Sequence, residues 1–255
     1  MKTKLILLLV ACIPICIKTV CQDNNLQREI PILCYHNIFS GSDGKPGPLR
    51  ISASQLEQQL HALASNGYHS ISPDDLLQWM QGRTQLPANP VMITFDDSHL
   101  EHFTLAAPLL KQLGFRGAFF VMTVTIGKPH YLSAAQIKTL SDNGHVIGCH
   151  TWDHQPLGTG TIDWQQQLTK PKAILEKITG KPVNCFAYPY GEWNIAAIQQ
   201  IKAHGFTTAF QLSNAQNSQE PRFTIRRMIV AGNWSGTQLL QKMKATFPST
   251  GKTAR

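Results

Sequence analysis

The stretch that decides the fold is Val91-Met92-Ile93-Thr94-Phe95-Asp96-Asp97, a mostly apolar run that ends in two neighbouring aspartates. Short apolar runs rich in β-branched and aromatic residues are typical of strands buried on both faces of a parallel sheet. Two adjacent carboxylates directly after a buried strand are costly unless something cationic pairs with them. The same two residues are also compatible with an Asx turn and a helix cap to which Ser98 contributes.

A second polar segment, His150-Thr151-Trp152-Asp153-His154, follows a later apolar run. One aspartate and two histidines are enough to hold a divalent ion such as zinc and to leave a position open for water. The remaining aspartate is then free to act as a general base on that water. A single loop histidine needs no such role, but a pair separated by three residues, in a chain with two adjacent acids, favours a metal site.

Apolar runs alternate with amphipathic stretches along the chain, which predicts parallel strands joined by helices. Strands are expected at 30–35, 91–95, 117–122, 146–150, 183–187, 206–210 and 223–230. Helices are expected at 52–66, 100–113, 133–143, 163–179, 194–204 and 235–247, with a kink at Pro171 in the fourth. This is the pattern of a single α/β domain, and an α/β barrel fits the length of 255 residues.

The polar residues of interest share one position in this pattern, because each lies just past the end of an expected strand. His36 follows the first strand, and Tyr188-Pro189-Tyr190-Gly191 follows the fifth. In a parallel barrel the strand tips converge at that end and carry the site. His36 is therefore a candidate acid for a leaving group, although a histidine at a strand end needs no function. Pro189 would fix the backbone N–H of Tyr190 as an oxyanion donor, although the four residues also fit a plain turn.

The first 21 residues have the features of an export signal, with two lysines before the apolar run 5–11. Pro14 and Lys18 interrupt the stretch, which disfavours a membrane anchor of about 20 apolar residues. Cleavage after Cys21 competes with a lipobox-like sequence that would leave a lipidated Cys12 attached to the membrane. We therefore expect an exported protein, periplasmic, cell-surface or secreted, with a single domain at 22–255.

The net charge of the chain limits its binding partners, and the positions of its cysteines limit its disulfide bonds. The net charge is +8, and residues 1–21 hold three lysines and no acid, so their removal leaves 8 − 3 = +5. Lysines and arginines are dispersed, so nucleic acid is a poor partner and a neutral or anionic polymer a better one. Cys34, Cys149 and Cys185 lie inside apolar runs, where buried free thiols are ordinary, while one disulfide between two of them stays open in an oxidising compartment.

Three motifs, Thr94-Phe95-Asp96-Asp97, His150-Thr151-x-x-His154 and Pro189-Tyr190-Gly191, together resemble those of the polysaccharide deacetylase family, also called NodB homology or carbohydrate esterase family four. The resemblance covers nearly all of the chain after residue 21 and implies a distorted (β/α) barrel with fewer than eight parallel strands. It implies that Asp97, His150 and His154 hold a divalent metal ion, zinc first and cobalt or nickel as alternatives. It also implies that Asp96 is the general base and that the Tyr190 backbone lines the oxyanion hole.

The sequence departs from the family pattern in several places. No Leu-x-His motif, whose histidine is the acid in many relatives, occurs near 239–247. The stretch 32–36 resembles instead the N-terminal Tyr-His of a permuted subgroup that includes poly-N-acetylglucosamine deacetylases, so His36 would take the acid role. Ser98 replaces the usual glycine after the two aspartates. Ala187 stands where many relatives have an arginine that pairs with the catalytic aspartate, and Arg226 or Arg227 would have to reach the site from a late strand.

The resemblance implies a metal-dependent hydrolase that removes N-acetyl groups from a β-linked amino-sugar polymer such as poly-N-acetylglucosamine, a chitin-like polymer or peptidoglycan. Tyr188, Trp152 and Pro189 are candidates for binding that polymer, Trp152 either as a sugar-stacking platform or as a core residue. We expect a monomer without an organic cofactor. The enzymatic alternative is a hydrolase of the same fold acting on another amide or on an ester such as acetylxylan. The other alternative, a non-catalytic glycan-binding wall protein, is disfavoured because a pure binder needs no base beside a metal.

Overall fold

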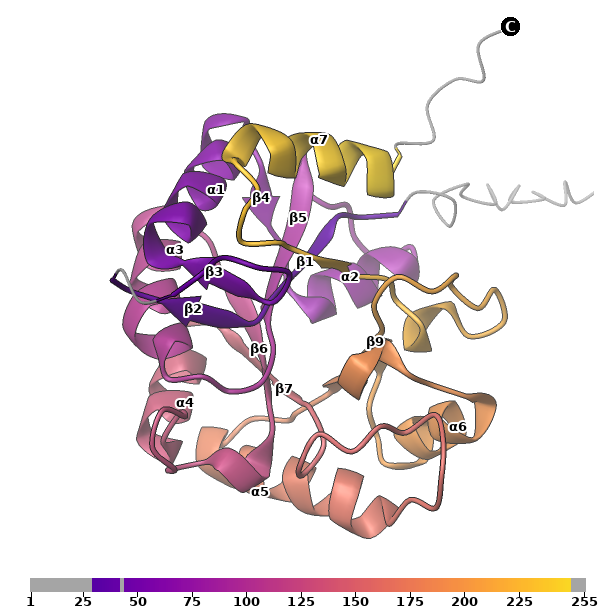
Figure 1. The fold of residues 1–255 in the computed structure, drawn as a ribbon. Coiled ribbons are helices and arrows are strands. Elements are labelled where there is room, and N and C mark those ends of the chain that lie inside the picture. Colours follow the sequence, from indigo (N-terminus) through magenta and orange to yellow (C-terminus); the bar gives the residue numbers. More distant parts are fainter. Residues whose placement is uncertain (1–28, 42–43, 249–255) are drawn as a thin grey trace, which may run out of the picture.

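The computed structural model describes residues 29–41 and 44–248. The expected export signal, residues 1–21, lies outside the described residues and stays a prediction. Seven strands follow one another in a curled parallel sheet with helices around it (Figure 1). Their order is β10 (Met228–Ile229), β1 (Ile32–Tyr35), β5 (Pro90–Phe95), β6 (Gly117–Val121), β7 (Val146–Cys149), β8 (Cys185–Ala187) and β9 (Thr208–Phe210). The predicted distorted barrel with fewer than eight parallel strands in its wall is confirmed.

The segment 225–229 joins the two edges of this sheet. A parallel bridge pairs Phe210 of β9 with Ile225, and the backbone N–H of Arg227 donates to the carbonyl oxygen of Leu212. β10, which begins one residue later, pairs with β1. The expected strand at 223–230 therefore exists in its second half only, and it carries Arg227 into the mouth of the barrel.

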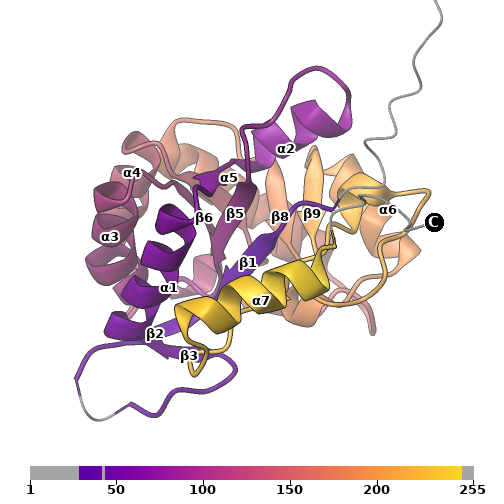
Figure 2. The same cartoon turned by 90° about the horizontal axis from the view of Figure 1, so that it is seen from above.

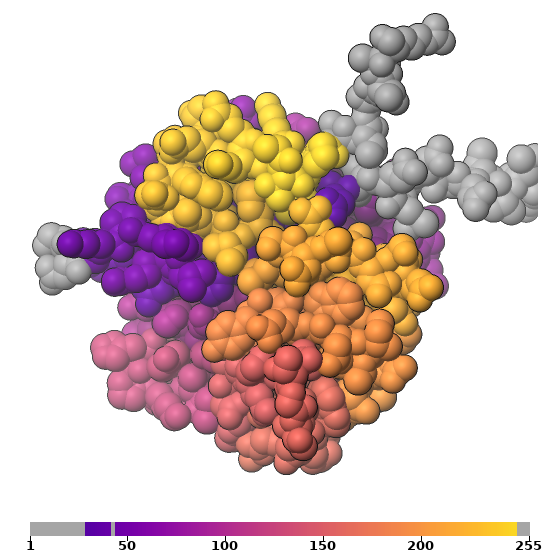
Figure 3. Space-filling model, turned by 45° about the vertical axis from the view of Figure 1, so that its right-hand side comes forward, coloured from indigo at the N-terminus to yellow at the C-terminus, as the bar shows by residue number. Residues whose placement is uncertain are grey.

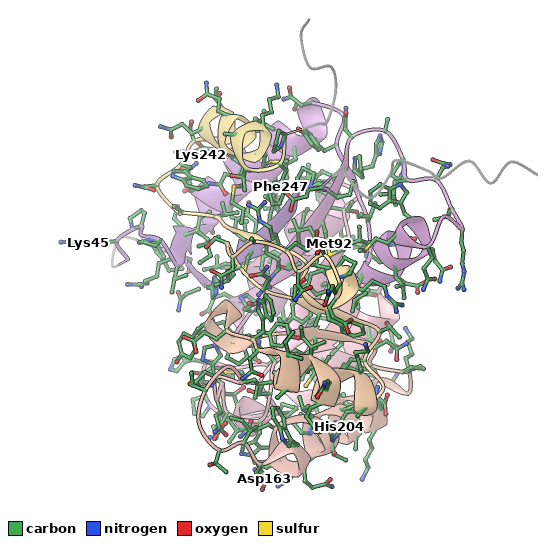
Figure 4. The ribbon with its side chains drawn as sticks, turned by 90° about the vertical axis from the view of Figure 1, so that its right-hand side faces the viewer. Lys45, Met92, Asp163, His204, Lys242 and Phe247 are labelled. Carbon is green, nitrogen blue, oxygen red and sulfur yellow. The ribbon has the colours of Figure 1, made fainter. Side chains whose placement is uncertain are left out.

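Three shorter strands lie beside the wall of the barrel. β4 (His69–Ser70) pairs with the start of β5, and β2 (Asn37–Phe39) pairs with β3 (Arg50–Ser52) in a separate two-stranded sheet beyond the end of β1. Figure 4 shows Lys45, in the connection between β2 and β3, pointing away from the barrel, and Met92 of β5 in its middle. The β2–β3 unit thus extends the end of the barrel at which the strands finish.

The alternation of side chains along β5 divides the hydrophobic core into two parts. Val91, Ile93 and Phe95 pack in the layer between the sheet and the helices, whereas Met92 packs inside the barrel. α2 (Pro73–Met80) closes the opposite end of the interior with Leu76. The interior of the barrel is therefore a packed core and not a channel. The polar side chains of the inner face lie at the open end of the barrel.

The remaining helices cover the outside of the sheet. They are α1 (Ala53–Ser65), α3 (Ala107–Gln112), α4 (Ala134–Asp142), α5 (Lys170–Thr179), α6 (Ile195–Ala203) and α7 (Gly236–Thr246). α1, α4, α6 and α7 begin directly after Ser52, Ser133, Asn194 and Ser235, whose side chains cap the first turn. α1 and α7 lie side by side although they come from opposite ends of the chain (Figure 2). On the surface, yellow C-terminal residues accordingly lie against indigo N-terminal ones (Figure 3).

Two of the expected helices contain a π turn in front of a proline. Residues 102–106 form such a turn before Pro108 of α3, and residues 165–169 form another before Pro171 of α5. Proline has no N–H and clashes with the carbonyl four residues back, so a wider turn relieves the conflict. At Pro171, where the sequence predicts a kink, the helix begins with a π turn. The turn before Pro108 places His102 beside the end of β1.

The apolar pattern does not predict α2, although the sequence marks its start. Ser72 caps the helix and shares a reciprocal capping box with Asp75, and Pro73 occupies the first turn. Pro73, Leu76 and Leu77 are buried at helical spacing, but the helix has only eight residues, so the pattern repeats too few times to stand out. The capping signature is the signal that would have found it.

Candidate active site

The two aspartates after β5 occupy different depths at the open end of the barrel. The period of two puts Thr94 and Asp96 on the inner face, where both are buried, while Asp97 lies at the rim with its side chain 24% exposed. Asp97 and Ser98 have left-handed backbones, with φ 75° and 64°, which explains why glycine suits this turn. The Ser98 hydroxyl accepts the backbone N–H of Met122 at 2.8 Å and so ties the ends of β5 and β6 together.

Arg227 forms a two-pronged ion pair with Asp96. Its Nη1 and Nη2 each donate to one carboxylate oxygen at 2.7 Å. Nη1 also donates to Thr94 Oγ1 at 3.2 Å, and Nε donates to the carbonyl oxygen of Gln211 at 3.1 Å. Both charged side chains are almost fully buried, so each compensates the charge of the other.

This pair decides the protonation state of Asp96. Burial alone would raise the pKa of Asp96, but the Arg227 guanidinium outweighs burial and holds the pKa well below its ordinary value. Arg226, the other arginine that the sequence singled out, donates instead to Glu29 Oε2 at 2.7 Å near the start of β1. The arginine that many relatives carry in place of Ala187 is thus supplied here from the segment before β10.

Asp97, His150 and His154 meet at the rim of the barrel. Asp97 Oδ1 lies 3.5 Å from Nε2 of His150 and 3.5 Å from Nε2 of His154. The two imidazole rings stand 4.8 Å apart at an angle of 72°. The structure therefore brings together the three side chains that the sequence singled out as ligands, although they come from two different loops.

The chemistry of these three residues fits a divalent metal ion. Separations of 3.5 Å are long for a hydrogen bond but close to the edge, roughly 3.3 Å, of a tetrahedron with metal bonds of about 2.0–2.1 Å. Among the described residues, Asp97 Oδ1 is a buried oxygen without a hydrogen-bond partner. His150 Nδ1 donates to the carbonyl oxygen of Ala187 at 2.7 Å, which leaves the lone pair of Nε2 facing Asp97. Thr151 Oγ1 accepts the backbone N–H of His154 at 2.9 Å and holds the loop in place.

His36 lies at the end of β1, beside Asp96. Cys34 Sγ donates to Asp96 Oδ2 at 3.5 Å and lies 4.0 Å from both ring nitrogens of His36. One atom each of Cys34, His36 and Asp96 lies within 4.8 Å of the other two. Burial lowers the pKa of His36, and the negative charge of Asp96 opposes that shift. The candidate acid and the candidate base therefore face the same space.

The three cysteines of the described part of the chain, Cys34, Cys149 and Cys185, are free and buried. Burial raises the pKa of Cys149 and of Cys185 to about 12, so both stay protonated and unreactive. The disulfide that the sequence left open among these three residues is not formed. Their ordinary interpretation as buried thiols holds in this structure.

The turn after β8 places its side chains differently from the expectation. Tyr188 and Pro189 are buried, and the Tyr188 hydroxyl donates to the carbonyl oxygen of Phe223 at 3.1 Å. Both side chains are thus buried in this structure, and their predicted contact with a polymer stays a prediction that their burial does not support. Tyr190 is the exposed aromatic residue of the turn, and its ring packs against that of His154 at 4.5 Å.

Trp152 is half-buried beside the two histidines. Lys170 Nζ lies 4.0 Å from the centre of its ring, so a cation covers one face of the indole. The backbone N–H of Trp152 donates to Gln167, and Gln167 also donates to Asp153. Asp153 thus binds an amide and not an imidazole. Trp152 offers at most its other face to a sugar.

Several residues that support the site lie outside the set predicted from the sequence. Thr94 accepts from Arg227 and donates to the carbonyl oxygen of Leu33 at 2.8 Å, and its inward position on the strand was the available signal. Thr151 lies within the second motif. His102 carries no local signal for its contact with His36, which lies 66 positions earlier, and for Arg227 the sequence left Arg226 as the alternative.

Comparisons with known proteins agree with this geometry. The family model for polysaccharide deacetylase matches residues 83–209. The chain is 26% identical over 211 residues to the Bacillus subtilis (strain 168) protein YxkH, which is named for this family; the match covers 82% of this chain and 74% of that protein. It is 20% identical over 240 residues to the poly-beta-1,6-N-acetyl-D-glucosamine N-deacetylase of Escherichia coli (strain K12), covering 76% of this chain and 36% of that protein. The structure of Streptococcus pyogenes deacetylase PplD in complex with acetate shares the fold, with a TM-score of 0.77 and 24% identity over 84% of this chain and 98% of that one.

The fold and the site define a barrel hydrolase with an Asp-His-His group at its rim, and the matched range runs from before β5 into β9. It includes both aspartates, both histidines and Tyr190, whereas His36 and Arg227 lie outside it. The chain belongs to the polysaccharide deacetylase family.

Proposed function

We propose that this chain is a metal-dependent hydrolase that removes N-acetyl groups from a β-linked amino-sugar polymer. The observation that carries the proposal is the position of Asp96, held by Arg227, beside Asp97, His150 and His154. A binding module has no need of an unprotonated buried carboxylate next to a group of metal ligands. The reaction takes an acetamide and water to acetate and a free amine.

Asp97, His150 and His154 would hold the ion, zinc first, with cobalt or nickel as alternatives. Such an ion, when bound, polarises the acetyl carbonyl and makes water easier to deprotonate. Asp96 Oδ2 lies 3.9 Å from His150 Nε2, so this carboxylate adjoins the ligand group without belonging to it. Because Arg227 keeps Asp96 unprotonated and oriented, we assign Asp96 the role of general base.

His36 and Tyr190 would complete the catalytic set. His36 protonates the departing amine, a role that its place beside Asp96 supports. The backbone N–H of Tyr190 donates to the oxyanion, a contribution of about 3 kcal/mol in the transition state. Tyr190 has φ 58°, a conformation that a non-glycine residue keeps only where its surroundings fix it and that is frequent at functional sites.

The substrate class is supported by the relatives and by the surface near the site. The Escherichia coli relative is named for poly-β-1,6-N-acetyl-D-glucosamine, although this chain covers about a third of its length. Tyr190 is 62% exposed next to His154, so its ring offers a surface on which a pyranose can stack. Tyr190 thereby replaces Tyr188 and Pro189 as the candidate for sugar contact.

Acetate release from a panel of polymers tests the proposal. The protein is incubated with poly-N-acetylglucosamine, chitooligosaccharides, peptidoglycan and acetylxylan, each with a chelator and with added zinc, cobalt or nickel. We expect acetate from at least one amino-sugar polymer, only when metal is present. Release from acetylxylan alone would establish the esterase alternative, and polymer binding without acetate release under any condition would establish the non-catalytic alternative.

Metal content tests the ligand group independently of activity. Wild type should hold about one ion per chain, and His150→Ala should lose most of it, because a site with two protein ligands is far weaker than one with three. His145→Ala is the matched control, since His145 is a buried histidine near the opposite end of the strands. An unchanged metal content in His150→Ala would remove the basis of the proposal.

We also propose that the chain is an exported monomer. The leader lies outside the described residues, and within 29–41 and 44–248 no helix is long and apolar enough to cross a bilayer. Mass spectrometry of the protein from its native host should show a chain that begins after Cys21 or one with a lipid on Cys12. A full-length chain retained in the cytoplasm would contradict export.

A further inference from the structure

His102 lies beneath His36 and is not among the residues assigned a role so far. It begins the π turn 102–106 and is fully buried. Its Nε2 lies 2.7 Å from the carbonyl oxygen of His36. A carbonyl oxygen only accepts, so Nε2 carries the proton and donates. His102 therefore holds the backbone of the candidate acid through a short hydrogen bond.

The sequence around His102 explains its position. Pro108 forces the preceding turn to widen, and the backbone N–H of Ala107 reaches back to the carbonyl oxygen of His102. The π turn thus begins at His102 itself. π turns inside helices are frequent at functional sites, where the wider turn re-aims a side chain.

The surroundings of His102 favour a neutral donor. The rings of Phe95 and Phe119 pack at 5.3 and 6.1 Å from its ring, and among the described residues Nδ1 has no hydrogen-bond partner. Burial lowers the pKa of His102 to about 3. The proton on Nε2 is therefore retained as a fixed donor over the pH range in which a hydrolase works.

We propose that His102 is a positioning residue that sets the orientation of His36 relative to Asp96. The inference rests on the proposed function, in which His36 is the acid. Three of the hydrogen bonds at the end of β1 hold consecutive residues, 35, 36 and 37. Asp96 N–H donates to the Tyr35 carbonyl at 3.0 Å, His102 donates to the His36 carbonyl, and Asn37 N–H donates to the Leu49 carbonyl at 3.0 Å.

The hydrogen bond from His102 is the one of the three that comes from a side chain, so a substitution can remove it without altering the backbone. Its loss leaves His36 free to turn about the peptide that follows it. A displacement of the acid by about 1 Å can lower the rate by up to a hundredfold. His102 acts on the reaction through His36 and touches no substrate.

The test compares two substitutions at His102 with a control. His102→Phe removes the donor and keeps an aromatic ring against Phe95 and Phe119, whereas His102→Gln keeps an N–H donor of similar reach. His145→Phe is the control, because His145 is also buried, packs on Phe119 at 5.3 Å and bonds a backbone group, but lies near the opposite end of the strands. His102→Leu replaces His102→Phe if the latter does not fold.

We expect His102→Phe to lower kcat for an amide by about tenfold to a hundredfold and to affect an activated ester less, since its leaving group departs without a proton. KM should change little. His102→Gln should recover most of the rate, and His145→Phe should match wild type. In a His36→Ala background the effect of His102→Phe should vanish. An equal loss in that background, or in His145→Phe, would overturn the proposal.

A second readout needs no turnover. In protein labelled at histidine Cε1, the NMR signal of His36 should shift or broaden in His102→Phe and stay in place in His102→Gln and His145→Phe. An unmoved His36 signal in His102→Phe overturns the positioning role. If wild type releases no acetate from any polymer while the His36 signal responds as expected, the proposed function has failed and the positioning role stands.

Discussion

Arg227 shows how a single residue far away in sequence completes this site. A carboxylate as deeply buried as Asp96 would ordinarily take up a proton, because burial disfavours its charge. The guanidinium of Arg227 matches both of its oxygens and reverses that preference. The family position occupied here by Ala187 instead supplies a carbonyl oxygen that orients His150. Arg227 thus holds the candidate base Asp96, and the backbone of Ala187 holds the candidate ligand His150.

Replacing Arg227 with methionine should move the acid limb of the pH profile. Arg227 lowers the pKa of Asp96, so its removal should raise that pKa. Because Asp96 must be unprotonated to act as a base, the loss of activity on acidification should then begin at a higher pH than in wild type. The free energy of unfolding at neutral pH should fall by about 3–5 kcal/mol, because one partner of a buried pair is left without compensation. The measurements are kcat/KM against pH and chemical denaturation.

Arg226→Met is the matched control for this substitution. Arg226 pairs with Glu29 through side chains that are 25% and 30% exposed, and such pairs contribute about 0–1 kcal/mol. Its pH profile should coincide with that of wild type. An acid limb that stays in place in Arg227→Met, or moves equally in both variants, would contradict the assignment of Arg227.

Local motifs predicted the reactive groups but not the residues that hold them. Asp96, Asp97, His150 and His154 were found because each follows an apolar run within a short motif, and strand ends of a parallel sheet meet in space. The burial of Tyr188 was not predictable, because a turn sequence does not reveal which of its side chains is buried. Arg227 was named only as one of two candidates, since reaching Asp96 depends on the closure of the barrel.

At the scale of elements, capping residues and prolines gave the most reliable information. Four helices begin where a serine or asparagine precedes the apolar pattern, and α2 was missed although Ser72 carries the same signature. The two expected helices with internal prolines begin with π turns. The sequence shows that a proline must disrupt the hydrogen bonding of a helix, but it does not show whether the backbone responds with a kink or with a wider turn.

The burial of His102, in the π turn before α3, leads to a prediction about the stability of the fold at acid pH. With a folded-state pKa of about 3, His102 stays neutral when folded while the unfolded chain binds a proton below about pH 6.5. Its contribution to stability is therefore complete above that pH and is lost as the pH falls toward 3. Between pH 7 and pH 5 wild type should lose on the order of 2 kcal/mol more than His102→Phe.

Denaturation in urea at several pH values measures this difference. The gap in unfolding free energy between wild type and His102→Phe should narrow steadily from pH 7 to pH 5. His102→Gln, which also has no group that titrates in this range, should show the same trend. A gap that does not change with pH would mean that His102 takes up a proton as readily in the folded chain as in the unfolded chain.

At the scale of the whole molecule, the two ends of the described chain stabilise each other. α7 packs along α1 (Figure 2). Leu239 of α7 is buried in the same core as Leu60 of α1. The segment before α7 is held by Gln59, which donates to the Trp234 carbonyl at 2.8 Å and accepts from the Tyr35 hydroxyl at 3.0 Å. The barrel is therefore complete only when its last segment has joined its first strand.

Leu239→Ala should lower the free energy of unfolding by about 2–5 kcal/mol, the usual cost of truncating a buried leucine. Gln241→Ala, on the exposed side of α7, should change it by less than about 0.5 kcal/mol. The residual activity of folded Leu239→Ala at low temperature should match wild type, since α7 contributes no reactive group. Comparable stability of the two variants would contradict the closure of the fold by α7.

The architecture as a whole was predictable from the alternation of apolar and amphipathic stretches, which identified the seven wall strands and six of the seven α-helices. The short strands β2, β3 and β4 were not predictable, because two or three residues carry no periodicity. The pairing of 225–229 with both edges of the sheet was not predictable either, since it depends on contacts between residues far apart in sequence.

The central claim is that the two neighbouring aspartates have different roles, Asp97 as metal ligand and Asp96 as general base. The most direct test measures metal content and acetate release in the same preparation of Asp96→Asn, beside wild type. The account predicts that Asp96→Asn retains its metal and loses activity by a factor on the order of a hundred or more. Loss of metal and activity together would make Asp96 a ligand and contradict the account.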